Sequence, residues 1–213
     1  MEWLLEEFII DFVLTFCMRL FVAIDLDDPE YFSSMQEGLR KVAGAKMTFP
    51  SSYHITLKFL GEVDDAKKGK IAAALSSIKF GAFDLRCDHL GVFPSEREIR
   101  VVWAGFAGAQ GAGADRAFKE GYDSVVRLQK QIDSALKPMG FDLEKTFVPH
   151  VTLCRVKSLT PEGKKNISEH LKKMKVEPLR SVVRSFSLIK STLGREGPAY
   201  ETITTVEAEE RLL

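Results

Sequence analysis

The chain has 213 residues, of which 45% are hydrophobic, and its 30 basic and 30 acidic side chains cancel to a formal net charge of zero. This hydrophobic fraction can fill a substantial core and excludes a disordered chain. Zero net charge argues against a protein that grips long nucleic acid through many phosphate contacts, and favours a small or terminal phosphate as ligand. Three cysteines without metal-like spacing favour a reduced, cytoplasmic setting.

Residues 1–17 form a separate N-terminal extension in the sequence pattern. Their apolar stretches are interrupted by acidic residues, at Glu2, Glu6, Glu7 and Asp11. A signal peptide begins with basic residues and a membrane-spanning helix needs roughly 20 apolar residues in a row, so neither is predicted and no membrane partner is expected. Two interpretations stay open: a short amphipathic helix, or a natural translation start at Met18 that makes the extension non-native.

Strands and helices alternate through the first half of the chain. Asp28, Pro29 and Glu30 have the pattern of an N-cap, a first-turn proline and an early acid, which predicts a helix start. Gly61 is expected to end the strand that spans residues 53–60. The elements expected in this half are strands over 19–26, 47–49, 53–60, 83–92 and 100–106, and helices over 28–42 and 65–78.

The second half repeats this order. Four glycines within 105–113 indicate the connection between the halves, and the segment 160–162 has the same helix-opening pattern as residues 28–30. The elements expected here are helices over 119–136 and 160–175, and strands over 150–156, 184–193 and 200–206. We therefore expect a single catalytic domain over 18–213 with two lobes, roughly 18–110 and 111–213, between which strands can exchange.

The two halves also share a tetrapeptide: His54-Ile55-Thr56-Leu57 returns as His150-Val151-Thr152-Leu153. On a strand, residues two positions apart stand on the same face, so the histidine and threonine of each copy point together. The alternate positions are expected to face the core, namely Ile55, Leu57, Val151 and Leu153. If a pseudo-two-fold relates the halves, both polar pairs can line one groove.

Such a groove suits in-line displacement at phosphorus. Histidine has an unperturbed pKa near 6.5, so one copy can act as base while the other acts as acid. Threonine hydroxyls can bond the non-bridging phosphate oxygens. A lone His-x-Thr is ordinarily packing, but two matched copies favour catalysis. Neither copy offers a second histidine or a carboxylate on its face, so no metal and no cofactor is expected.

Three residues that follow the motifs are candidates for binding substrate: Lys58, Phe59 and Arg155. Strict alternation turns Phe59 and Arg155 away from the histidines, so a bulge, twist or strand end must intervene before Arg155 can clamp a phosphate and Phe59 can stack on a base. The same alternation places Lys58 on the groove side. The alternative is a core phenylalanine and two surface cations. His89 and His170 lie outside both motifs and have no matching threonine.

The segments 54–61 and 149–155 resemble the two signature motifs of the 2H phosphoesterases, and among these the RNA 2′,3′-cyclic phosphodiesterases, also called 2′-5′ RNA ligases. The resemblance covers about 18–206 and includes the segments 19–25, 140–144 and 197–200. It implies a bilobal α+β fold with antiparallel sheets lining a central cleft and helices outside. It also implies metal-independent hydrolysis of RNA 2′,3′-cyclic phosphate ends to 2′-phosphates, with reversible 2′-5′ ligation in some members.

The same resemblance implies individual roles. His54 would protonate the leaving 3′ oxygen, His150 would activate water, and Thr56 and Thr152 would hold the phosphate with help from Arg155. Departures from the family pattern are residues 1–17, the glycine-rich 105–113 stretch, and 47–49, where relatives often carry Trp. Expected ligands are RNA ends or small cyclic nucleotides, with no obligatory protein partner and a monomeric state. Alternatives are a phosphodiesterase for a small nucleotide or ADP-ribose cyclic phosphate, and a non-catalytic nucleotide-binding module.

Overall fold

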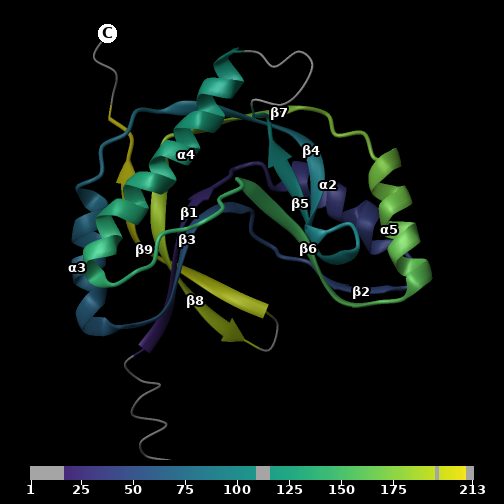
Figure 1. The fold of residues 1–213 in the computed structure, drawn as a ribbon, viewed down its shortest axis with the longest axis horizontal. Helices are drawn as coiled ribbons and strands as arrows, with labels where there is room; N and C mark the ends of the chain where they lie inside the picture. Colours follow the sequence, from purple (N-terminus) through teal and green to yellow (C-terminus); the bar gives the residue numbers. More distant parts are fainter. Residues whose placement is uncertain (1–16, 109–115, 195–196, 210–213) are drawn as a thin grey trace, which may run out of the picture.

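The computed structural model describes residues 17–108, 116–194 and 197–209. These residues form an α+β fold in which α3 and α4 lie beside one half of a curled sheet and α2 and α5 beside the other (Figure 1). In chain order the elements are β1 (Cys17–Asp25), α2 (Pro29–Arg40), β2 (Ala45–Thr48), β3 (His54–Asp64), α3 (Asp65–Ser76), β4 (Phe83–Ser95), β5 (Glu98–Phe106), α4 (Arg116–Leu136), the 3₁₀ helix η1 (Lys137–Met139), β6 (His150–Leu159), α5 (Pro161–Lys173), β7 (Leu179–Val183), β8 (Ser185–Gly194) and β9 (Gly197–Glu207).

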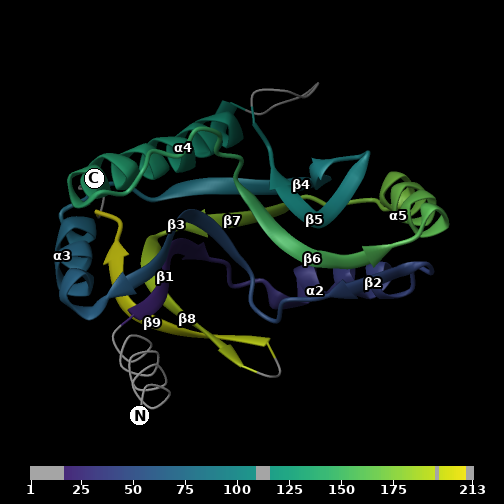
Figure 2. The ribbon, with the colours of Figure 1, turned by 60° about the horizontal axis from the view of Figure 1, so that its bottom comes forward.

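All the strands belong to one sheet of order β7-β4-β5-β6-β3-β1-β8-β9, with β2 paired to β6. The two motif strands, β3 and β6, are therefore neighbours near its middle (Figure 2). Strands β4 and β5 come from the first half of the chain but lie beside β6, whereas β8 and β9 come from the second half but lie beyond β3 and β1. A division of the chain near residue 110 therefore does not divide the sheet into two contiguous groups of strands.

Local chemistry sets the helix starts. The Asp64 side chain accepts a hydrogen bond from the Lys67 amide at 2.8 Å, and Thr160 Oγ1 accepts one from the Gly163 amide at 3.0 Å. Each side chain satisfies an amide that the first helical turn leaves without a partner. Asp28 precedes α2 as predicted but does not cap it, and instead accepts a hydrogen bond from Ser181 Oγ at 3.3 Å.

Several expected boundaries differ in the structure. Gly61 does not end β3: it adopts a positive φ of 70° beside an irregularity in the β1–β3 ladder, and the strand continues to Asp64. Glycine tolerates this backbone conformation at no steric cost. Strand β7 was not expected, and β4 runs on through Pro94. The expectations for residues 1–16 and for 109–113 lie outside the described residues.

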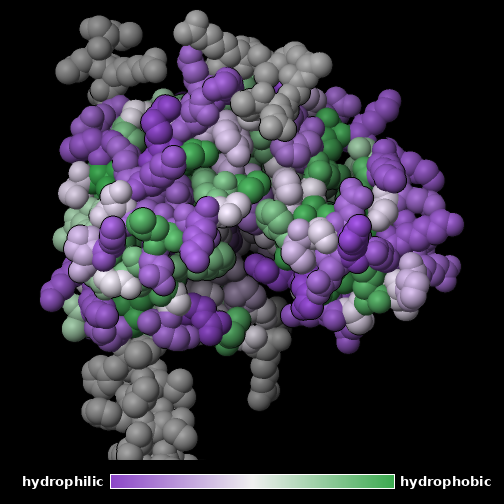
Figure 3. All heavy atoms as spheres, in the orientation of Figure 1, coloured by the Kyte–Doolittle hydropathy of each residue, from purple (hydrophilic) through white to green (hydrophobic). Residues whose placement is uncertain are grey.

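The main hydrophobic core lies between the sheet and the helices. Its largest fully buried side chains include Phe32, Phe106 and Phe186. The four apolar motif positions also belong to it, each at most 1% exposed: Ile55, Leu57, Val151 and Leu153. The face seen in Figure 3 mixes hydrophilic and hydrophobic residues and is hollowed near its centre. In the described ranges, no helix is long and apolar enough to cross a bilayer.

Candidate active site

The two motif strands meet at a single registered pair, in which Ile55 lies opposite Val151 in antiparallel orientation. Residues directly opposite each other in a sheet place their side chains on the same face, and both of these side chains are buried in the core. The polar motif residues therefore project from the other face, which we call the histidine face: His54, Thr56, His150 and Thr152. In this register each histidine lies opposite the threonine of the other motif, as a local two-fold through the central pair requires.

A β-bulge follows the first threonine. In the β1–β3 ladder, Ala23 faces Thr56 and Val22 faces Lys58, so Leu57 is the extra residue. A bulge inverts the alternation of side chains beyond it. Phe59, the residue after Lys58, therefore projects from the histidine face.

The second motif has the same bulge at the same place. In the β5–β6 ladder, Trp103 faces Thr152 and Val102 faces Cys154, so Leu153 is the extra residue. Arg155 is thereby returned to the histidine face as well. The two motifs thus share their bulge in addition to their sequence.

Phe59 and Arg155 consequently stand on the same face as the catalytic candidates. The Phe59 side chain is 69% exposed, and its ring centroid lies 6.3 Å from that of Phe21, which in turn lies 5.1 Å from His54. Arg155 is exposed, and its charge acts on both histidine rings. The condition attached to these two residues, an intervening bulge, is met.

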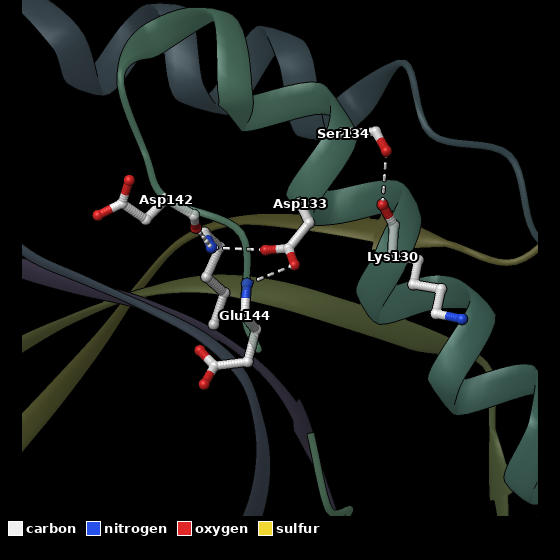
Figure 4. A network of polar contacts seen from close by, with 6 residues as sticks. Lys130, Asp133, Ser134, Asp142 and Glu144 are labelled. Atoms are coloured by element: carbon white, nitrogen blue, oxygen red, sulfur yellow. Dashed lines mark hydrogen bonds and ion pairs between the residues drawn. The ribbon is translucent and has the colours of Figure 1, made fainter. Parts of the chain in front are cut away.

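Lys58 is turned the other way by the same bulge, so the prediction that it faces the groove is wrong. It is 4% exposed, and its Nζ lies 2.5 Å from Asp133 Oδ1 and 2.6 Å from the Asp142 carbonyl oxygen. Figure 4 shows Asp133 reaching from α4 towards the loop that contains Asp142 and Glu144. The second carboxylate oxygen of Asp133 accepts a hydrogen bond from the Glu144 amide at 2.8 Å.

Each histidine ring is flanked by two aromatic rings from other strands. Centroid distances are 5.1 Å from His54 to Phe21, 5.5 Å from His54 to Tyr200, 4.9 Å from His150 to Phe93 and 5.9 Å from His150 to Trp103. Sequence patterns did not single out these four aromatic residues as site residues. Alternation can assign them to a face, but which strands are neighbours is a property of the assembled sheet.

Both imidazoles are held in the neutral form. Burial, followed by the positive charges of Arg155 and His150, lowers the pKa of His54 from 6.5 to about 4. Burial is also the largest effect on His150, where Arg155 adds to it and a hydrogen bond to Val148 opposes it, and the pKa of His150 is lowered overall. Charge from a bound anion would act in the opposite direction.

The tautomer of His150 follows from its neighbour. Its Nδ1 lies 2.8 Å from the Val148 carbonyl oxygen, which can only accept, so Nδ1 carries the hydrogen and donates. In the neutral ring this leaves Nε2 with a free lone pair. His150 is thereby prepared to take up a proton at Nε2.

Cys154 lies next to the second motif but is buried, and burial raises the pKa of its thiol to about 11. A thiol in this state is a poor nucleophile. Across the described ranges, no three His, Cys, Asp or Glu side chains are grouped so that they could hold a metal ion. The polar motif groups on the histidine face are the imidazoles of His54 and His150 and the hydroxyls of Thr56 and Thr152, with the Arg155 guanidinium beside them.

The family model described as LigT like phosphoesterase matches residues 24–103 and 119–200, which include both motifs. The chain belongs to this family. Two similar proteins are named RNA 2′,3′-cyclic phosphodiesterase. The one from Archaeoglobus fulgidus is 35% identical over 89% of this chain and 100% of its own length, and the one from Methanocaldococcus jannaschii is 35% identical over 87% and 98%.

The chain is also similar to solved structures of the same fold. A crystal structure of a Thermus thermophilus protein superposes with a TM-score of 0.68, at 24% identity over 91% of this chain and all of that one. Escherichia coli LigT in complex with 3′-AMP superposes with a TM-score of 0.66, at 22% identity over 91% and 99%. The expected bilobal α+β fold is confirmed.

Proposed function

We propose that the protein hydrolyses RNA 2′,3′-cyclic phosphate ends to 2′-phosphates by metal-independent acid–base catalysis. The observation that carries this proposal is the placement of two half-buried imidazoles, two hydroxyls and Arg155 on one face, around the central pair of β3 and β6. The names of the Archaeoglobus and Methanocaldococcus relatives support the same activity.

In the proposed reaction the phosphorus sits between the two histidines. Nε2 of His150 takes a proton from water as the water oxygen bonds to phosphorus, and His54 gives a proton to the 3′ oxygen as its bond to phosphorus breaks. The products are a 2′-phosphate and a free 3′ hydroxyl, and proton exchange with solvent restores both rings. Thr56 and Thr152 donate hydrogen bonds to the non-bridging oxygens.

Arg155 supports this division of roles. A guanidinium beside the phosphate compensates the charge that builds up on its oxygens in the transition state. The bound phosphate, being negative, in turn opposes burial and the nearby positive charges, which together hold the pKa of His54 near 4. Substrate binding therefore helps to load His54 with the proton that it delivers.

Phe59 completes the substrate-binding residues by stacking on the base of the terminal nucleotide. An exposed aromatic ring beside the reacting groups offers the π-face that any base can cover. Nucleotide binding is on record for a protein of this fold, since E. coli LigT was crystallised with 3′-AMP and with ATP. We also retain the proposals of one bilobal catalytic domain over 18–213, a monomeric state, a cytoplasmic location and a capacity for reversible 2′-5′ ligation.

The products of the reaction test this function. A short RNA with a 2′,3′-cyclic phosphate end is incubated with the protein in the presence of a chelator, and the products are separated by phosphorus NMR. We expect a 2′-phosphate with the chelator having no effect on the rate. A 3′-phosphate would show that the 2′ oxygen leaves, and loss of activity in chelator would show that a metal takes part.

A further inference from the structure

Tyr200 reaches the candidate active site from a distant strand. In the β8–β9 ladder Tyr200 faces Ser191, and in the β1–β8 ladder Ser191 faces Arg19, which lies two positions before Phe21. Partners in such a row share a side of the sheet, and so do residues two positions apart on a strand. Tyr200 therefore projects from the histidine face, as does Phe21, whose ring contacts both Tyr200 and His54.

The curl of the sheet brings Tyr200 onto His54. Strands β9 and β3 are separated by β8 and β1, so a flat sheet would keep their backbones about 14 Å apart. The rings of Tyr200 and His54 nevertheless lie with their centroids 5.5 Å apart and their planes nearly perpendicular. The sheet therefore curls towards the histidine face (Figure 1), and β9 supplies a side chain to a site built on β3 and β6.

Arg155 connects Tyr200 with both histidines. The charge of its guanidinium acts on the rings of His54 and His150 and also on the Tyr200 hydroxyl. Because the interaction between charges weakens with distance, the guanidinium lies near all three groups. An anion that contacts both Arg155 and His54 therefore occupies space that Tyr200 borders.

The Tyr200 hydroxyl is free to bind such an anion. Burial raises the pKa of Tyr200 although the charge of Arg155 opposes this, so the hydroxyl keeps its hydrogen at neutral pH and can donate it. Among the residues that the structure describes, neither this hydroxyl nor the Arg155 guanidinium forms a hydrogen bond or an ion pair. Tyr200 is also 40% exposed, so a ligand can reach it.

We propose that the Tyr200 hydroxyl donates a hydrogen bond to a non-bridging oxygen of the reacting phosphate, beside the contact from Arg155. This inference rests on the proposed function and adds a catalytic residue to it. Negative charge grows on the non-bridging oxygens as water bonds to phosphorus, so this hydrogen bond is strongest in the transition state. Tyr200 thereby joins Thr56, Thr152 and Arg155 as a donor to these oxygens.

The variant Tyr200→Phe tests this contact, because it keeps the ring beside His54 and removes only the hydroxyl. Two quantities are measured: the dissociation constant of inorganic phosphate, from NMR shifts of the histidine rings, and kcat/KM for a 2′,3′-cyclic-phosphate-ended RNA. We expect the dissociation constant to rise and kcat/KM to fall, each by about 10-fold or more, because a hydrogen bond to a charged group is lost. Tyr122→Phe is the matched control and should leave both quantities unchanged, since Tyr122 packs against the core from α4.

The pKa of His54 in the absence of phosphate, taken from the same spectra, separates a contact with phosphate from a positioning role. It should be the same in Tyr200→Phe as in the unchanged protein. An altered pKa of His54 together with a lower rate would show that Tyr200 acts through His54, and this result would overturn the proposal, as would an unchanged dissociation constant with an unchanged rate. Weaker phosphate binding in Tyr200→Phe, in a protein that turns over no cyclic-phosphate-ended RNA even when unchanged, would uphold the contact and overturn the proposed function instead.

Discussion

At the scale of single residues, the two motifs are equivalent except for the side chains beyond their bulges. The first motif presents Phe59 on the histidine face and the second presents Arg155. Symmetry alone cannot decide which histidine is acid and which is base. The Val148 carbonyl resolves part of this question, because it fixes the tautomer that leaves Nε2 of His150 free to accept.

The charge of Arg155 gives a measurable pH signature. In the free protein both imidazoles have a pKa below 6.5, so both are neutral at neutral pH, and His54 gains its proton only near pH 4. Removing a nearby positive charge favours the protonated ring, so Arg155→Ala should raise the pKa of His54 in an NMR titration. A bound nucleotide 2′-phosphate should also raise it.

The same variant should lower kcat/KM by about 10-fold or more, since a charge-assisted contact to the phosphate is lost. Lys130→Ala on the exposed side of α4 is the control for an unspecific loss of positive charge. A His54 ring that titrates near 6.5 in the unchanged protein, or that does not respond to Arg155→Ala, would contradict the electrostatic account of the site.

At the scale of elements, the sequence predicted most strands and helices near their observed positions, including the helix starts after Asp64 and Thr160. Alternation also placed the four polar motif residues together. The bulges could not be predicted from the sequence. A pattern of alternating side chains assumes an uninterrupted ladder, and the pairing with the partner strand decides where an extra residue is placed. Lys58 was therefore assigned to the wrong side, while Phe59 and Arg155 depended on a bulge that only the structure shows.

The buried ion pair of Lys58 and Asp133 makes a stability prediction. Lys58→Met leaves a buried carboxylate without its cation and should lower the free energy of unfolding by about 3–5 kcal/mol in urea denaturation. The double variant Lys58→Met/Asp133→Leu should be more stable than Lys58→Met, because no unpaired charge remains.

Lys68 offers the control, because it forms an ion pair with Asp65 on the surface of α3, and its replacement by methionine should cost less than about 1 kcal/mol. Equal effects of Lys58→Met and Lys68→Met would show that the buried pair does not hold β3 against α4.

At the scale of the whole molecule, one curled sheet brings together segments that are far apart in the chain. The strand order could not be read from the sequence, since the exchange of β4 and β5 with β8 and β9 depends on which edges pair. This strand order determines which residues lie together at the candidate site. The motif strands become neighbours at the Ile55–Val151 pair, and polar residues nearly one hundred positions apart project from the same face of the sheet.

The central claim is that both histidines act together on one phosphate, and the rates of the two single variants test it most directly. Hydrolysis of a 2′,3′-cyclic-phosphate-ended RNA is measured for His54→Ala and His150→Ala, with circular dichroism to verify folding. Loss of either a general acid or a general base should lower the rate by at least about 100-fold in each variant. A folded variant of either kind that keeps a rate near that of the unchanged protein would contradict the two-histidine mechanism.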